Sequence, residues 1–246
     1  MNVISGHGFQ YEIEDRVKNN GWKMHPEESY IDDVELKPRK VDFVAIKSHE
    51  SYNPRGKQIA LVVECKYLDK DHNIKFWFRD NPKDHRAYFM EGYNARELFL
   101  DESSFHFFTH EKVAVNLEAG KEKNIVYEAI MQASKGLIYL RQSPEILYTK
   151  GLFYPIVVYK GPGRVCDQDD NQVKDVLYYH QYKWRDPKTQ RITTHNLYVD
   201  IIHESNLEAY LNDIFKKEMD YLMDLFYFKR RMEENRNRGY KWNEAR

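Results

Sequence analysis

The sequence predicts an α/β fold in which helices flank a central mixed β-sheet. Short apolar, β-branched runs bounded by turn residues indicate strands, and segments with apolar residues three and four apart indicate helices. The two kinds of segment alternate along the chain, which is typical of layered α/β domains. No internal repeat or low-complexity linker divides the 246 residues, so we expect one domain over 1–246.

The first half of the chain predicts a helix followed by two strands. Residues 6–22 have apolar positions at helical spacing and the stop signal NNG from Asn19. Residues 40–47, KVDFVAIK, and 58–68, QIALVVECKYL, read as strands, and the turn-rich loop between them favours a hairpin. The stretch 69–121 is polar, aromatic and without a clean period, so we expect it to be an insertion after the second strand.

The second half predicts a helix, three strands and a final helix. The helix is expected within 121–143, where Ala129, Ala133 and Leu137 lie on one side. The strands are expected in 151–160, 174–184 and 195–203, because these segments are rich in apolar, β-branched and aromatic residues. A long helix from about Ser205 to Arg231 leads into a basic tail, so that 205–246 forms a C-terminal helix and tail.

Composition limits the classes of function. A net charge of −1 means that any attraction for nucleic acid must come from local clusters of Lys and Arg. The two cysteines, Cys65 and Cys166, are too few for a disulfide framework, which suits a reducing, cytoplasmic compartment. No apolar run approaches the ~20 residues that span a bilayer, so we expect no membrane partner.

The end of the second predicted strand carries the candidate chemistry. Side chains alternate along a strand, so Glu64 and Lys66 point to one face and Cys65 to the other. Cys65 is therefore interpreted as a small buried hydrophobe rather than as a nucleophile. Asp42 lies on the preceding strand, and a hairpin would bring it beside Glu64.

Two neighbouring carboxylates repel each other unless a divalent cation lies between them. Hard oxygen ligands favour Mg²⁺ or Mn²⁺, ions that polarise a phosphoryl oxygen and lower the pKa of a bound water. Lys66 would orient or deprotonate that water, or hold a phosphate oxygen. The alternative is a chance pattern, in which an acid and a lysine at a strand end form an ordinary solvated ion pair.

Four segments, 8–22, 41–46, 59–66 and 125–140, together resemble the PD-(D/E)XK nuclease superfamily, and its Mrr-like members look closest. The family pattern G-x-x-[FY]-E is matched by GFQYE, which ends at Glu12. Its metal-binding aspartate is matched by Asp42, and its E-x-K signature by Glu64-Cys65-Lys66. A glutamine on the following helix is matched by Gln132. Two departures are Val41 in place of the proline of "PD" and the long stretch 69–121.

The resemblance implies a restriction-endonuclease-like core and a role for each matched residue. Asp42 and Glu64 would be metal ligands, joined by the main-chain carbonyl of Cys65, and Lys66 would orient the attacking water. Glu12 would support a second ion or a metal-bound water. Gln132 would position the phosphate or the lysine.

The function that follows is a Mg²⁺- or Mn²⁺-dependent endonuclease acting on DNA, in restriction or anti-phage defence. The defence role, and a homodimer or a partner protein of a defence system, follow from family analogy. Two alternatives stay open. One is a non-catalytic nucleic-acid-binding or assembly subunit, and the other is a nuclease of DNA repair or junction resolution.

Further residues are candidates for contact with nucleic acid. Lys135 lies three positions after Gln132 and would reach a phosphate, unless it is simply an exposed lysine. Lys75 and Arg79 are interleaved with aromatic residues in NIKFWFRD, a composition that stacking platforms for nucleic acid use. The alternative is a satellite hydrophobic cluster under a long loop.

Overall fold

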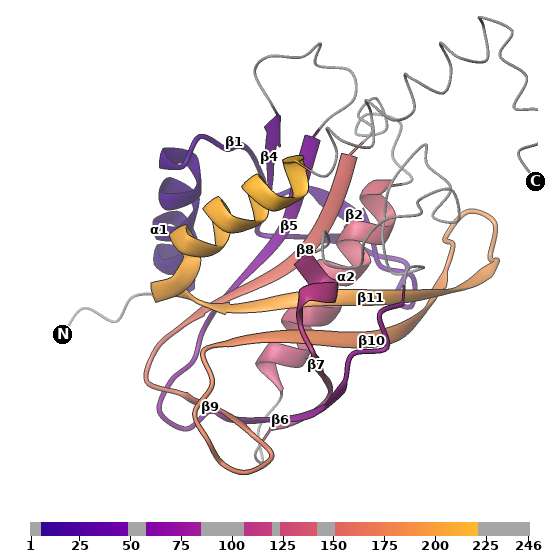
Figure 1. The fold of residues 1–246 in the computed structure, drawn as a ribbon. Coiled ribbons are helices and arrows are strands. Elements are labelled where there is room, and N and C mark those ends of the chain that lie inside the picture. The colour runs from indigo at the N-terminus through magenta and orange to yellow at the C-terminus, as the bar shows by residue number, and fades with distance from the viewer. Residues whose placement is uncertain (1–5, 49–57, 85–105, 120–123, 142–150, 221–246) are drawn as a thin grey trace, which may run out of the picture.

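A mixed β-sheet forms the centre of the computed structural model, which describes residues 6–48, 58–84, 106–119, 124–141 and 151–220. In sheet order its nine strands are β1 (Lys23–Pro26), β4 (Phe43–Ser48), β5 (Gln58–Tyr67), β8 (Gly151–Lys160), β11 (Ile192–His203), β10 (Asp175–Arg185), β7 (Lys112–Ala119), β6 (Asn73–Asp80) and β9 (Arg164–Asp167). β5 and β8 are parallel, whereas β4 and β5 are antiparallel. The predicted α/β class with a mixed sheet is confirmed (Figure 1).

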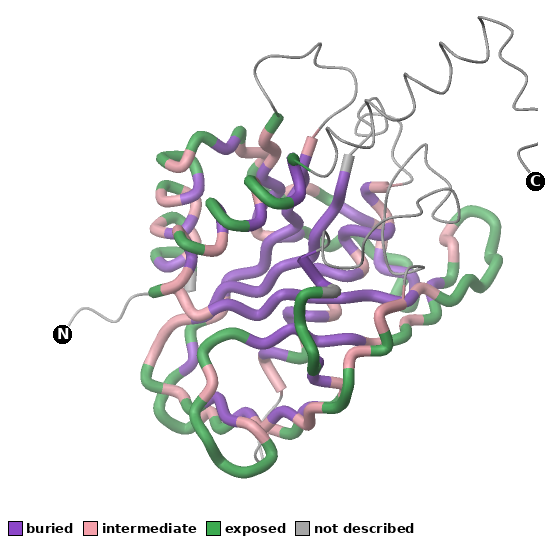
Figure 2. The backbone as a smooth tube through the Cα atoms, in the orientation of Figure 1, coloured by how far each residue is buried: buried purple, intermediate pink, exposed green. Residues whose placement is uncertain are grey.

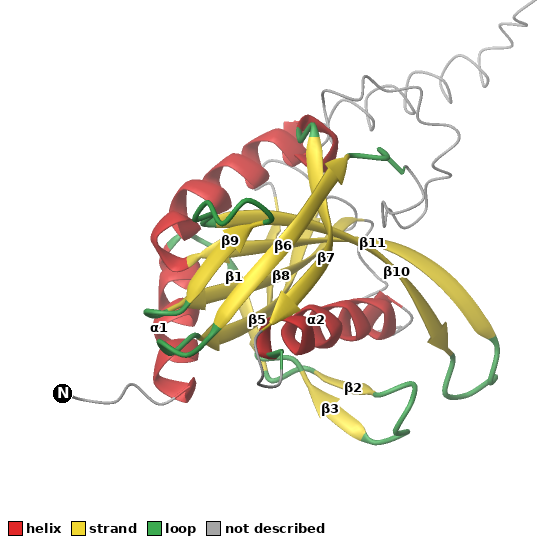
Figure 3. Cartoon of the chain, turned by 90° about the horizontal axis from the view of Figure 1, so that it is seen from below, coloured by secondary structure: helices red, strands yellow, loops and turns green. Residues whose placement is uncertain are grey.

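Helices cover both faces of this sheet (Figures 1 and 3). α1 (Gly6–Asn19) and the helical residues 207–220, which follow the short helix η5 (Glu204–Asn206), pack on one face through apolar residues such as Phe9 and Leu211. α2 (Ile125–Arg141) packs on the other face. No helix in the described ranges is long and apolar enough to cross a membrane.

Most predicted elements are found close to their expected places. α1 ends at Asn19, where Gly21 adopts a φ of +79° that glycine tolerates best. The predicted hairpin exists as β4 and β5, with Phe43 opposite Val63. Part of the last helix is also found, while residues 221–246 of the predicted helix and tail lie outside the described residues.

The stretch 69–121 contains two strands that the sequence did not predict. β6 and β7 pair with each other and belong to the central sheet, and η4 (His106–Thr109) precedes β7. A small separate sheet, β2 (Ser29–Ile31) with β3 (Pro38–Lys40), was also not predicted. In β6 the buried Ile74 and Phe76 do alternate with more exposed residues, but the polar and aromatic neighbours hide this period.

β5 lies in the middle of the core, and its carboxyl end meets the turn that follows β8. Its residues from Ile59 to Cys65 are buried (Figure 2). The N–H of Leu68 donates to the carbonyl of Lys160 at 2.7 Å. Gly161 has a φ of +123°, and a Cβ there would lie 2.1 Å from the oxygen of Leu68, so this close approach requires glycine.

Candidate functional site

The end of β5 points its side chains as strand alternation predicts. Cys65 packs into the core that α1 covers, and burial raises the pKa of its thiol. Lys66 faces α2 instead, where its Nζ donates to Glu64 Oε2 at 2.8 Å and to Gln132 Oε1 at 3.2 Å. The structure therefore brings together Glu64, Lys66 and Gln132, which lie up to 68 positions apart in the sequence.

The β4–β5 hairpin places Asp42 beside this group. The register that pairs Phe43 with Val63 brings Asp42 opposite Glu64. The Oδ2 atom of Asp42 accepts a hydrogen bond from the N–H of Cys65 at 2.7 Å. The two carboxylates expected to act together are therefore neighbours.

Glu64 lies in an environment that opposes its negative charge. Its residue is 1% exposed, and its Oε1 atom accepts no hydrogen bond from the described residues. Burial and then the neighbouring Asp42 raise the pKa of Glu64 to about 7, although Lys66 partly offsets them. Burial also raises the pKa of Asp42. A cation bound between the two carboxylates would relieve both effects.

Lys66 is held as a cation. Burial alone would lower the pKa of Lys66, but the charge of Glu64 and its hydrogen bond outweigh burial and raise the pKa. A lysine in this state cannot accept a proton. Its positive charge suits the stabilisation of a phosphate rather than the deprotonation of a water.

Glu12 forms its described contacts with residues other than the carboxylate pair. Its carboxylate accepts hydrogen bonds from Lys160 Nζ at 3.0 and 2.9 Å and lies 3.9 Å from Arg16. From α1, Gln10 reaches Asp42: its Nε2 donates to the carbonyl of Asp42 at 3.1 Å and to Glu14 Oε1 at 2.8 Å. The sequence interpretation missed Gln10 and Glu14. Their i, i+4 spacing beside the buried Phe9 was the available signal.

Lys135 is a structural residue in this arrangement, not an exposed lysine. Its side chain is 13% exposed, and Nζ lies 2.7 Å from Asp32 Oδ2 and 3.3 Å from Asp33 Oδ1. Asp33 in turn accepts hydrogen bonds from the hydroxyl of Tyr182 and from the N–H of Arg185. Lys135 thus ties α2 to the residues that follow β2 and, through Asp33, to β10, and its charge is already paired with two aspartates.

Lys75 and Arg79 lie on β6, and four strands separate β6 from β5 in the sheet order. Lys75 forms an ion pair with Asp170 at 2.8 Å, and the guanidinium of Arg79 lies 5.8 Å from the ring centre of Tyr179. Neither residue contacts the carboxylate pair through a described interaction.

The residues at the end of β5 fit a divalent cation of the Mg²⁺ type. Within the described ranges no group of three or more His, Cys, Asp or Glu side chains is arranged to hold a metal. Mg²⁺ does not require such a group, because it commonly uses one or two carboxylates and fills its remaining positions with waters and phosphate oxygens. The unpaired Oε1 atom of Glu64 is the observation that favours a bound cation.

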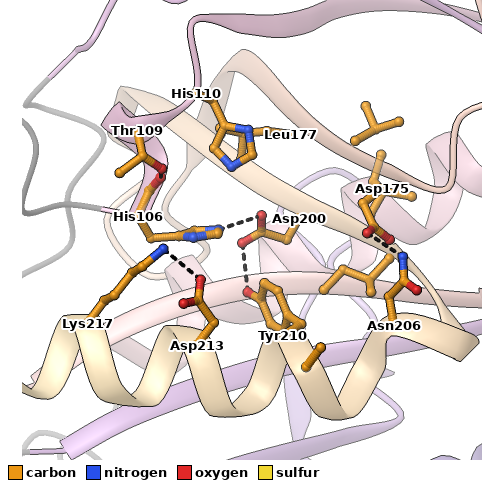
Figure 4. A pocket seen from close by; sticks show the side chains of 14 residues that line it. His106, Thr109, His110, Asp175, Leu177, Asp200, Asn206, Tyr210, Asp213 and Lys217 are labelled. Carbon is orange, nitrogen blue, oxygen red and sulfur yellow. Dashed lines mark hydrogen bonds and ion pairs between the residues drawn. The ribbon is translucent and has the colours of Figure 1, made fainter.

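A separate cavity of about 530 Å³ lies between η4, β10, β11 and the helical residues 207–220 (Figure 4). His106 Nε2 lies 3.0 Å from Asp200 Oδ1, and the hydroxyl of Tyr210 donates to Asp200 Oδ2 at 2.8 Å. None of the residues predicted to form the metal site lines this cavity.

Comparisons of the chain with protein-family models, with curated proteins and with solved structures each return no match.

Proposed function

We propose that this chain is a metal-dependent endonuclease that hydrolyses phosphodiester bonds of DNA and has a restriction-endonuclease-like core. One observation carries the proposal. Asp42 and the buried, incompletely hydrogen-bonded Glu64 lie side by side, with Lys66 and Gln132 next to them. These four residues, two on β5, one on α2 and one just before β4, have the chemistry that binds a hard cation next to a phosphate.

In this proposal Asp42, Glu64 and the main-chain carbonyl of Cys65 hold Mg²⁺ or Mn²⁺. When bound, the ion would supply Lewis-acid stabilisation of the phosphoryl oxygens and a more acidic water. Lys66 offers its charged Nζ to the phosphate as negative charge develops. Gln132 accepts one of the three donors of Lys66 and so fixes the direction of the ammonium group. Gln10, rather than Glu12, supports the backbone of Asp42 from α1.

The test is cleavage of plasmid DNA by the purified chain with Mg²⁺ or Mn²⁺. Asp42→Asn and Lys66→Met should each reduce the cleavage rate by about 10²–10⁴-fold, because Asp42→Asn weakens binding of the ion that would stabilise the reacting phosphate and Lys66→Met removes a positive charge beside it. Glu12→Gln is the matched control and should stay within about tenfold of the wild-type chain, because Glu12 contacts Lys160 instead. Undiminished cleavage by Asp42→Asn and Lys66→Met would overturn the proposal. DNA binding without cleavage in every divalent ion would favour the non-catalytic subunit.

A defence role adds a prediction in cells. Expression of the wild-type chain should lower phage plating efficiency in a sensitive host, and Lys66→Met should restore it. Equal plating with both chains would leave the nuclease assignment intact and favour repair or junction processing as its setting.

A further inference from the structure

The outer half of the β10–β11 hairpin extends beyond the rest of the sheet as a two-stranded ribbon. β11 pairs with β8 from Asp200 onward, and β10 pairs with β7 at Tyr178. From 181 to 196 the two strands pair with each other in an unbroken antiparallel register, with Arg185 opposite Ile192 at the far end. Figures 1 and 3 show this ribbon projecting at one side of the molecule, which we call the β10–β11 arm (residues 181–196).

The β10–β11 arm carries a local concentration of positive charge. Its four cations are all exposed: Lys183, Arg185, Lys188 and Arg191. Its one acidic residue is Asp186, whose Oδ1 accepts hydrogen bonds from the N–H groups of Lys188 and Thr189. Among the described residues, none of these four cations forms an ion pair. In a chain of net charge −1, this is a marked local excess.

The arm is also rigidly held. Trp184 is buried on the face opposite Lys183 and Arg185, because side chains alternate along the strand. Tyr182 donates to Asp33, and Asp33 is paired with Lys135 of α2. The cations are therefore presented on a preformed ribbon anchored to the helix that carries Gln132, and little ordering is needed before they bind a partner.

We infer that the β10–β11 arm is a surface that binds the phosphate backbone of double-helical DNA. Clustered, unpaired lysine and arginine side chains are what phosphate neutralisation requires. A two-stranded ribbon fits the major groove of B-form DNA, which is about 12 Å wide, whereas the major groove of A-form RNA is too narrow for protein elements. The choice of DNA as partner rests on the proposed nuclease function, but the binding itself needs no residue of the metal site.

The test measures binding of a fluorescent 30-base-pair DNA duplex in EDTA, between 50 and 200 mM salt. Lys183→Gln combined with Arg185→Gln should lower the slope of log affinity against log salt by about 2, since each lost phosphate contact removes about 0.9. At 0.1 M salt this corresponds to roughly 60-fold weaker binding. Lys183→Arg combined with Arg185→Lys keeps both charges and should retain the wild-type slope.

The matched control is Lys18→Gln combined with Lys23→Gln, which removes two exposed lysines from α1 and β1. It should leave the slope unchanged. The inference would be overturned if the arm variant kept the wild-type slope, or if the control variant lost as much of the slope as the arm variant. Tighter binding of an RNA duplex of the same sequence, if it also depended on the arm, would overturn the inference as well.

Asp42→Asn separates this inference from the nuclease proposal, because it should abolish cleavage and leave DNA binding by the arm intact. If the wild-type chain binds through the arm but never cleaves, the nuclease proposal fails and this inference stands.

Discussion

At the scale of single residues, Glu64 is a buried carboxylate whose charge the described residues compensate only in part. A carboxylate that is 1% exposed, with one oxygen lacking a hydrogen bond in the described chain, loses solvation that Lys66 alone does not replace. Since Asp42 adds a second carboxylate, the single positive charge of Lys66 does not balance the two negative charges of the site. The cation of the proposed function would complete this balance.

This predicts that divalent ions stabilise the folded protein through Glu64. At an ion concentration about 100 times the dissociation constant, Mg²⁺ or Mn²⁺ should add about 2.7 kcal/mol to the free energy of unfolding and raise Tm. Glu64→Gln should abolish this ion-dependent rise at pH 8. Thermal melts with and without the ion measure it. Glu218→Gln is the control, because Glu218 is an equally buried carboxyl whose pKa is also raised to about 7. Loss of the ion effect in both variants, or in neither, would contradict the prediction.

Gln10 gives a second prediction at this scale. Its amide links the carbonyl of Asp42 to Glu14, so Gln10→Ala should loosen Asp42 without touching the ligands themselves. Such supporting contacts typically change metal affinity by about 10- to 100-fold. We expect the Mg²⁺ concentration for half-maximal cleavage to rise by that factor while the maximal rate changes less. Tyr11→Ala, an exposed neighbour on α1, should leave the Mg²⁺ dependence unchanged. A fall in maximal rate alone would argue against a positioning role.

At the scale of elements, α2 must approach β5 closely for Gln132 to reach Lys66. Gly136 permits this approach, because a Cβ at that position would lie 2.4 Å from Val41 Cγ1 and 3.4 Å from Val62 Cγ1. Val41 and Val62 both lie on the side of α2 that faces the sheet. The absence of a side chain at Gly136 therefore sets the spacing between the helix and the site.

Gly136→Ala should consequently destabilise the protein although alanine favours helices. The overpacking cost of about 1–3 kcal/mol should exceed the gain of about 1 kcal/mol in helix propensity. Denaturant unfolding measures the difference. Val41→Ala removes the atom that clashes, so combining it with Gly136→Ala should cost less than the two single changes added together. Strict additivity of the two substitutions would show that the close approach does not limit packing.

The sequence predicted the elements whose patterns are local. α1, α2, β4, β5, β8, β10 and β11 follow from apolar periodicity and turn residues, and strand alternation alone placed Glu64 and Lys66 on one face. β6 was missed because its buried residues are interleaved with other aromatic and polar ones, and β7 because its buried residues do not alternate strictly along the strand. Ion-pair partners could not be predicted either, since Lys135 meets Asp32 across 103 positions and Glu12 meets Lys160 across 148. Such contacts depend on how helices and sheet pack, not on any local pattern.

At the scale of the whole molecule, one buried polar network joins three distant parts of the chain. His106 of η4 contacts Asp200 of β11, and its N–H donates to Glu218 in the helical residues 207–220. Tyr210 contributes a further hydrogen bond to Asp200. Because these segments are held together partly by ionisable groups, the stability of the whole fold should depend on pH near neutrality.

The direction of that dependence follows from two groups. Burial lowers the pKa of His106, but Asp200 outweighs burial and raises this pKa. The stability that charged His106 contributes is therefore present below pH 6.5 and is lost as the pH rises through the raised pKa. Burial raises the pKa of Glu218 from 4.5 to about 7, so its ionisation costs stability increasingly between those values. Both effects lower stability as the pH rises across neutrality.

The neighbouring ionisable groups do not change this direction. Burial and then His106 lower the pKa of His110, and this shift increases stability with rising pH only below pH 6.5. The neighbouring Asp213 and Lys217 are exposed and form an ion pair with each other.

Glu218→Gln isolates the contribution of Glu218, because glutamine cannot ionise but keeps an oxygen that can accept from the backbone N–H of His106. Relative to the wild-type chain, this variant should be more stable at pH 8 than at pH 5 by at most about 3 kcal/mol, which is the free energy equivalent of the raised pKa. Denaturant unfolding in EDTA at the two pH values measures it without interference from ions at the Glu64 site. Glu111→Gln, a change at an exposed residue near η4, should show no such difference. An equal change in stability at both pH values would mean that Glu218 is ionised in the folded protein at pH 5 and at pH 8. The network would then be a conventional ion pair rather than one that titrates near neutrality.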